Sequence, residues 1–181
     1  MERSEAVELM ESRLKNKNLR KHVLAVAAVM RRLAEEFGED ADKWEIAGLL
    51  HDLDYEETAD DPDRHGLVSA EVLEEMGVSP DVINAVKAHA DKAPRETKMD
   101  KAAYCADPVT GFIVACALIH PEKSLDPIDV PFAMKRMKEK RFAAGADRNR
   151  IAACDELGLS VEDFMELSID AMKGIKKDLG L

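Results

Sequence analysis

Residues 46–57 read IAGLLHDLDYEE, an apolar run from Ile46 to Leu50 that gives way at once to His51 and Asp52. The run is typical of a buried helix, and the chain contains only five histidines. A His-Asp pair alone is weak evidence for a site, since a histidine at a helix end often only caps carbonyl groups. The interpretation of this pair therefore depends on the other histidines and carboxylates.

Composition limits the classes of protein to be considered. The chain has 181 residues, of which 46% are hydrophobic, enough for one domain with a full core, and we predict a single domain over residues 1–181. Lys and Arg number 26 against 37 Asp and Glu, which gives a net charge of −11. This charge disfavours a nucleic-acid polymer or an anionic membrane as partner, whereas a local cationic site could still bind a small phosphorylated compound. It leaves the oligomeric state open.

The N-terminal residues 1–17 are charged and contain no apolar signal-like region. The longest apolar run, Phe112 to Ile119, is shorter than the roughly 18 residues that span a bilayer. Cys105, Cys116 and Cys154 are an odd number of cysteines without CxxC spacing. Cys105 and Cys116 are eleven residues apart, about three helical turns, so we expect both to face the core as small apolar side chains in a reducing compartment. The sequence thus predicts a cytoplasmic protein.

Hydrophobic periodicity predicts an all-α fold, because no segment alternates long enough for a strand. We expect Pro108 to kink or locally open the most apolar helix. Linker-like composition is confined to residues 58–63 and 120–131. The predicted helices span residues 18–38, 40–52, 65–77, 79–90, 99–119, 132–142, 148–157 and 161–179.

The remaining histidines fall on helices or at their ends. His22 lies near the apolar stripe of its helix, His65 opens a later helix and His89 closes the next one. Asp107 stands inside the apolar segment AAYCADPVTGFIVACALI. A buried unpaired carboxylate is costly, so Asp107 is expected to be paired, neutralised or bound to a metal ion.

Six residues carry one pattern along the chain: His22, His51, Asp52, His65, His89 and Asp107. A histidine, a later His-Asp pair and a distant aspartate give the chain its resemblance to the HD superfamily of metal-dependent phosphohydrolases. The two histidines between the pair and the last aspartate match its two-metal subgroup. The resemblance implies an HD-type helical bundle with the metal site between helices, a metal-binding core over about residues 18–120 and C-terminal helices over about 132–179. The resemblance to small members of the family extends to about residue 158. The segment HGLVS, which begins at His65, lacks the GYP signature of the branch that cleaves cyclic dinucleotides, and this disfavours a cyclic dinucleotide as substrate.

By this resemblance, one ion is held by His22, His51, Asp52 and Asp107. Asp52 also bridges to a second ion held by His65 and His89. Four imidazoles and two carboxylates suit one or two ions of iron, manganese, cobalt, nickel or zinc, whereas calcium prefers oxygen ligands alone. The pKa of metal-bound water falls from about 15.7 towards about 7, which supplies hydroxide for attack on phosphorus. Asp52 is then also the catalytic residue that orients the hydroxide.

The implied function is a phosphohydrolase acting on a small phosphorylated substrate, with a nucleotide as the favoured class. Two alternatives stay open: a di-iron oxygenase of the same superfamily, and a non-catalytic regulatory protein that keeps a metal ion for structure. Asp54, Glu56 and Glu57 extend the acidic character after the pair, and a role outside the chemistry is the favoured interpretation for them. If one of them donates a proton to the leaving group, Asp54 is the first choice.

A basic segment, FAMKRMKEKRF at residues 132–142, adds candidates for substrate binding. At 100° per residue, Arg141 falls on the apolar face of the predicted helix, and Lys138 borders that face. An inward arginine requires an anionic partner, so Arg141 is a candidate phosphate anchor with Lys138 beside it, and a structural ion pair is the alternative for Arg141. Arg148 and Arg150 are weaker candidates.

Overall fold

The computed structural model describes residues 1–181 and is all-α, with no strand. The all-α prediction is therefore confirmed. The helices are α1 (Arg3–Arg13), α2 (Lys17–Phe37), α3 (Ala41–Leu50), α4 (Tyr55–Thr58), α5 (Leu67–Glu75), α6 (Pro80–His89), α7 (Lys98–Ile119), α8 (Val130–Met137), α9 (Arg148–Ala152), a 3-10 turn (Ala153–Leu157), α10 (Val161–Gly174) and α11 (Lys176–Leu179).

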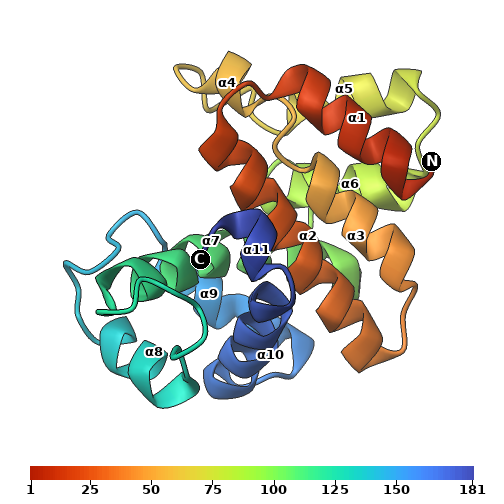
Figure 1. Ribbon diagram of the computed structural model, residues 1–181. Coiled ribbons are helices and arrows are strands. Elements are labelled where there is room, and N and C mark those ends of the chain that lie inside the picture. Colours follow the sequence, from red (N-terminus) through yellow and green to blue (C-terminus); the bar gives the residue numbers. More distant parts are fainter.

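The two longest helices, α2 and α7, pack against each other and organise the rest of the fold. α3 packs on α2, α6 packs on α7, and α10 contacts both long helices. In Figure 1, α1, α4, α5 and α6 lie in the upper part of the view and α8 and α10 in the lower part, and α2 runs from the one part to the other. α2 and α7 therefore link the N-terminal and C-terminal helices.

α2 begins and ends where its sequence predicts. Asn16 is the N-cap, and its side chain accepts a hydrogen bond from the backbone N–H of Asn18. Gly38 ends the helix in the left-handed region at φ 67°. Between these caps, residues at steps of three and four face the core, including Val23, Met30 and Leu33, which are fully buried.

The core is one cluster of 44 buried apolar residues that runs from Ala6 in α1 to Leu179 in α11. All three cysteines lie in it as free thiols, which confirms the core position predicted for Cys105 and Cys116. Burial raises the pKa of Cys116 to about 12 and that of Cys154 to about 11. The thiols are therefore protonated and behave as small apolar side chains.

α7 is the central core helix, although its length and apolar character would also suffice to cross a membrane. Of its most apolar 18-residue window, 61% is buried inside the protein. The helix runs unbroken through Pro108, so the predicted local opening is not found. Proline cannot donate to the carbonyl of Tyr104 four residues earlier, and the guanidinium of Arg150 lies 3.4 Å from that oxygen instead.

A glycine sets the close approach of α3 to α2. A Cβ atom on Gly48 would lie 2.6 Å from the Cα of Ala27, a distance that a side-chain carbon cannot adopt. The contact places the C-terminal end of α3, where His51 and Asp52 follow, beside the helix that carries His22. Gly48 thus contributes to the site through backbone packing.

Several predicted boundaries are wrong. α8 ends at Met137, five residues before the predicted end at residue 142. The predicted last helix is divided at Ile175, whose φ of −115° interrupts it between α10 and α11. No helix is predicted before residue 18, yet α1 forms and buries Ala6 and Met10.

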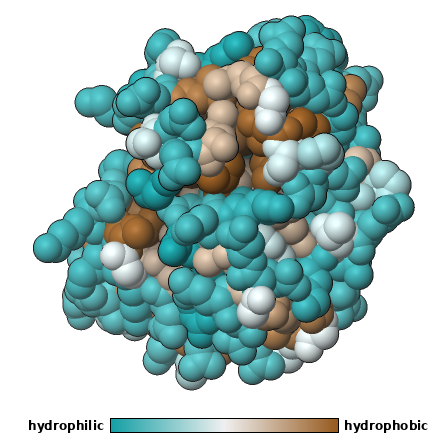
Figure 2. All heavy atoms as spheres, turned by 90° about the vertical axis from the view of Figure 1, so that its right-hand side faces the viewer, coloured by the Kyte–Doolittle hydropathy of each residue, from teal (hydrophilic) through white to brown (hydrophobic).

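The surface is mostly polar. Figure 2 shows one face in which hydrophilic residues dominate and apolar residues gather in a hollow in the upper half. The large apolar side chains that are exposed number six in all: Met1, Tyr55, Leu67, Met76, Leu118 and Ile119.

Candidate metal centre

The fold brings together all six side chains that the sequence pattern singled out. Each comes from a helix or from a residue at a helix end, so the site is built between helices. They are His22 in α2, His51 and Asp52 directly after α3, His65 just before α5, His89 at the end of α6 and Asp107 in α7.

Asp52 occupies the middle of the group. Its Oδ2 lies 3.6 Å from Nε2 of His22 and 3.4 Å from Nε2 of His51. Its Oδ1 lies 3.4 Å from Nε2 of His65 and 3.5 Å from Nε2 of His89. Each carboxylate oxygen therefore faces its own pair of imidazoles.

The other separations have the same scale. Nε2 of His22 is 3.2 Å from Oδ1 of Asp107, and the Nε2 atoms of His65 and His89 are 3.2 Å apart. Ligand atoms that sit about 2.0–2.2 Å from a shared transition-metal ion lie roughly 3.0–3.5 Å from one another. The spacing of the donor atoms thus fits coordination of a metal ion.

Two of the histidines are oriented by backbone carbonyls. Nδ1 of His51 donates to the carbonyl oxygen of Gly48 at 2.8 Å, and Nδ1 of His89 donates to that of Val86. A carbonyl can only accept, so Nδ1 carries a proton in both rings and Nε2 is the nitrogen left for another partner. Both rings therefore present Nε2 to the centre as a metal ligand would.

His65 is oriented by a buried carboxylate. Its Nδ1 donates to Oδ1 of Asp54 at 2.9 Å, while Oδ2 of Asp54 accepts from the backbone N–H groups of Gly66 and Ser69. Burial alone would raise the pKa of Asp54, but these hydrogen bonds outweigh it and the pKa is lowered. Asp54 is therefore an ionised acceptor that holds His65. A part for Asp54 as proton donor to the leaving group stays a prediction.

His22 is oriented by a hydroxyl group from α7. Thr110 donates its hydroxyl proton to the carbonyl oxygen of Asp107 at 3.0 Å. Its oxygen can then accept from Nδ1 of His22 at 3.1 Å. All four imidazoles thus keep Nε2 directed at the group.

The donor atoms fit a metal ion by two further observations. Nε2 of His51 is buried and has no hydrogen-bond partner in the protein. Because both Nδ1 atoms of His65 and His89 donate to other acceptors, their facing Nε2 atoms carry lone pairs that repel each other without a cation between them. Imidazole and carboxylate are the ligands that divalent transition metals accept.

The electrostatics of the site also favour a cation. Complete burial would lower the pKa of His51, yet the nearby negative charge of Asp52 raises it to about 9. Burial lowers the pKa of His89, which favours the neutral ring that ligates metals. Burial would raise the pKa values of Asp52 and Asp107, but the neighbouring imidazoles lower both. The two carboxylates are therefore ionised.

Arg150 in α9 reaches the centre from the C-terminal part of the chain. Its Nη2 lies 3.0 Å from Oδ2 of Asp107 and 2.6 Å from the carbonyl oxygen of His89. Its guanidinium also stacks over the ring of Tyr104, 4.5 Å from the centroid. Arg150 therefore fixes Oδ2 of Asp107 and leaves Oδ1 facing His22.

The centre opens into a cleft with a volume of ≈ 620 Å³. Arg150 is the one arginine or lysine among its lining residues. The predicted inward orientation of Arg141 is wrong: the side chain is exposed, as is that of Lys138, and neither lines the cleft. The reason is that α8 ends at Met137, so helical stepping no longer applies to residues beyond it.

Two residues of the site, Thr110 and Arg150, were not predicted from the sequence or were only weaker candidates. Thr110 follows Asp107 by three residues and so lies near it on the same helix, which is a readable signal for a polar residue in an apolar segment. Arg150 was ranked below Arg141, and no local pattern shows that α9 packs against α7. Its role follows from tertiary structure.

Comparison with known families agrees with this geometry. The HD domain family matches residues 19–147, more than half of the chain. The chain belongs to the HD domain family. Membership places this HD domain among metal-dependent phosphohydrolases and supports the His/Asp cluster as a binding site for divalent metal ions.

Curated relatives share the domain over part of their length. Ribonuclease Y of Nitratidesulfovibrio vulgaris (strain DP4) is 31% identical over 96 residues, which cover 53% of this chain and 18% of the relative. Ribonuclease Y of Opitutus terrae is 34% identical over 82 residues, covering 45% and 16%. Ribonuclease Y of Fusobacterium nucleatum is 32% identical over 80 residues, covering 44% and 16%. The HD domain described here thus matches less than a fifth of each of these relatives.

Proposed function

We propose that the protein is a phosphohydrolase that uses two divalent metal ions and acts on a small phosphorylated compound, with a nucleotide as the substrate class. The observation that carries this proposal is the position of Asp52. Its two carboxylate oxygens each face a separate pair of imidazole Nε2 atoms, at 3.4–3.6 Å. A carboxylate in this position can bridge two ions, with one pair of histidines on each.

Divalent ions held there supply Lewis acidity and lower the pKa of water from about 15.7 towards about 7, so that hydroxide is available near neutral pH. The protein side chains hold and orient. Asp52 would orient the attacking water by accepting its hydrogen bond, and Asp54 and Thr110 keep the rings of His65 and His22 in place. Arg150 holds Asp107 and adds positive charge to the cleft.

Charge supports a phosphate substrate at this site. Two divalent ions and Arg150 outweigh the negative charges of Asp52 and Asp107, so the cleft attracts an anion although the protein carries a net charge of −11. The same net charge opposes a long polyanion on the outer surface. A small phosphorylated compound satisfies both conditions.

The relatives support the nucleotide class. Their printed name describes ribonucleases, and RNA is a polymer of nucleotides joined by phosphodiesters. The aligned segment is confined to less than a fifth of each relative, so the shared part is the HD domain. We infer that the chemistry at the phosphorus atom is shared, with a mononucleotide in place of RNA.

Elemental analysis of the purified protein, followed by a phosphate-release screen with each candidate ion, tests the proposal. We expect up to two ions per chain and release of phosphate from nucleotides by the loaded protein. Chelation should abolish release and leave the helices intact, because the 44-residue core does not include the ligands.

Other outcomes would reassign the function. Oxygen consumption by the iron-loaded protein without phosphate release would favour an oxygenase. Faster cleavage of a short oligoribonucleotide than of any mononucleotide would assign an RNA substrate. Loss of helical structure on chelation, with no turnover of any kind, would favour a structural metal.

A further inference from the structure

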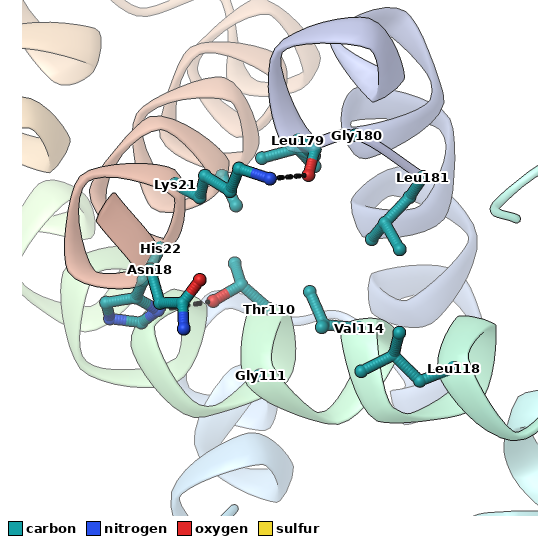
Figure 3. Close-up of a pocket in the computed structure, with 11 residues that line it drawn as sticks. Asn18, Lys21, His22, Thr110, Gly111, Val114, Leu118, Leu179, Gly180 and Leu181 are labelled. Carbon is teal, nitrogen blue, oxygen red and sulfur yellow. Dashed lines mark hydrogen bonds between the residues drawn. The ribbon is translucent and has the colours of Figure 1, made fainter. Parts of the chain in front are cut away.

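A second cavity, with a volume of ≈ 420 Å³, lies beside the metal cleft (Figure 3). It opens between α2, α7 and the C-terminal residues 179–181. The cavity and the metal cleft share two lining residues, His22 and Gly111. His22 is one of the candidate metal ligands, so the cavity begins next to the place where a substrate phosphate would bind.

α7 divides the two spaces between neighbouring strips of its surface. Pro108 and Ala115 line the metal cleft, whereas Val114 and Leu118 line the second cavity. Gly111 lies between the strips and lines both spaces. The ridge that separates the cleft from the cavity is therefore lowest at Gly111, where the helix has no side chain.

Neither packing nor backbone conformation requires a glycine at this position. A Cβ atom on Gly111 would meet no other atom within 4 Å, and its φ is not in the left-handed region. A glycine inside a helix costs about 0.5–1 kcal/mol of stability relative to alanine. The feature that glycine provides here is open space between the two cavities.

The walls of the second cavity are largely apolar, with polar groups at the edge. Ala25, Val114 and Leu118 line it from the two long helices, and Nζ of Lys21 donates to the carbonyl oxygen of Leu179 at 2.7 Å. The carboxamide of Asn18 points into the opening (Figure 3) and offers both a donor and an acceptor. Small-molecule sites commonly have about 300–1,000 Å³ and this mixture of apolar walls and few polar groups.

We propose that this cavity receives the non-phosphate part of the substrate, a flat, largely apolar group of nucleobase size, and that Gly111 determines specificity by leaving the way to it open. The inference rests on the proposed function, because it places the phosphate of the same substrate at the metal centre. The apolar walls bury the faces of the ring, and Asn18 binds its polar edge.

Two variants test the cavity, and a third is their control. Gly111→Leu raises the ridge between the cleft and the cavity, and Val114→Phe fills the cavity from the same helix. Gly174→Leu is the matched control, since a Cβ at Gly174 also meets nothing within 4 Å and the residue ends α10, outside both cavities. Leu118→Trp replaces Val114→Phe if that variant fails to fold, because Leu118 is 54% exposed.

The first measurement is selectivity between a nucleoside monophosphate and β-glycerophosphate, a phosphate ester without a base. In Gly111→Leu the ratio of the two kcat/KM values should fall at least tenfold, mainly through a higher KM for the nucleotide. Its metal content should match that of the wild type, and its Tm should not fall, because leucine is the better helix former.

The second measurement is binding of adenosine and uridine, which carry no phosphate, by ligand-observed NMR. We expect binding to the wild type and to Gly174→Leu, and its loss in Val114→Phe. If no ester is hydrolysed, the proposed function fails, while nucleoside binding that Val114→Phe abolishes still supports the cavity assignment. The inference is overturned if the nucleosides do not bind the wild type, or if both cavity variants leave binding and the selectivity ratio within twofold of wild type.

Discussion

The metal cleft has two walls of unlike construction. On one wall, the ligand wall, each candidate metal ligand lies in a helix or at a helix end, and each of the four imidazoles has a second contact that fixes Nδ1. The other wall is the turn over residues 138–147, where Ala143 has φ 44° and Arg148 donates to the carbonyl oxygens of Phe142, Ala143 and Ala146. Many contacts fix the side chains of the ligand wall, whereas Arg148 alone largely holds the turn wall. Substitutions in the ligand wall should therefore have the larger effects on catalysis.

Asp52→Asn should have the largest effect of all. The amide keeps the shape of the side chain but removes the charge that faces both pairs of histidines. Loss of a partner behind a metal ligand costs about 10–100-fold, so loss of the central ligand should lower kcat/KM for phosphate release by more than about 100-fold. Metal content by elemental analysis should fall in parallel.

Circular dichroism of Asp52→Asn serves as the control, because its helical signal should match that of the wild type. Wild-type turnover together with two ions per chain would show that Asp52 neither bridges nor orients.

Two arginines sharpen the comparison, since Arg150 contacts the ligand wall and Arg141 does not. Arg150→Ala should lower metal affinity and kcat/KM by about 10–100-fold, because Asp107 loses the group that holds its Oδ2. Arg141→Ala, the matched control, should remain within twofold of wild type because its side chain is exposed.

Metal titration separates positioning by Arg150 from a general loss of stability. Arg150→Lys keeps the charge but not the planar fork, and should recover only part of the affinity. Equal losses in the alanine variants of Arg150 and Arg141 would contradict the placement of the two arginines.

Asp54→Asn tests the contact behind His65. Asparagine can still accept from the ring, but it lacks the negative charge that makes His65 a better ligand. We expect about tenfold weaker binding of the second ion, seen as a loss of one ion per chain at limiting metal, with the first ion retained. Loss of both ions together would mean that the two halves of the centre do not bind separately.

Sequence patterns predicted the ligand wall well, because the signals that place its residues are local. Helical periodicity and an end signal such as Gly38 are local, so α2 was placed within a residue of its observed bounds. Asp107 was informative because a charge in an apolar helix is costly. The environment of these residues can therefore be predicted from their neighbours in the sequence.

The turn wall was predicted poorly because its structure depends on distant contacts. The predicted helix extends five residues past the observed end of α8, and the predicted inward orientation of Arg141 depended on these residues being helical. The site of Arg150 depends on α9 packing against α7, which no local pattern encodes. The contact of Asp54 with Nδ1 of His65 likewise requires a loop that brings His65 back to it, eleven residues later in the sequence.

Thr110→Val should have the smallest effect, and it tests how much one second contact contributes. Valine keeps the shape of threonine but cannot accept from Nδ1 of His22 or donate to the carbonyl oxygen of Asp107. A neutral hydrogen bond contributes about 0.5–1.5 kcal/mol, so metal affinity should fall roughly 2- to 10-fold. Calorimetric titration of the metal-free variant measures this directly, with Thr97→Ser at the N-cap of α7 as a control that keeps a hydroxyl outside the cleft. A loss as large as that of Asp52→Asn would mean that the orientation of His22, and not the bridging carboxylate, limits assembly of the ligand wall.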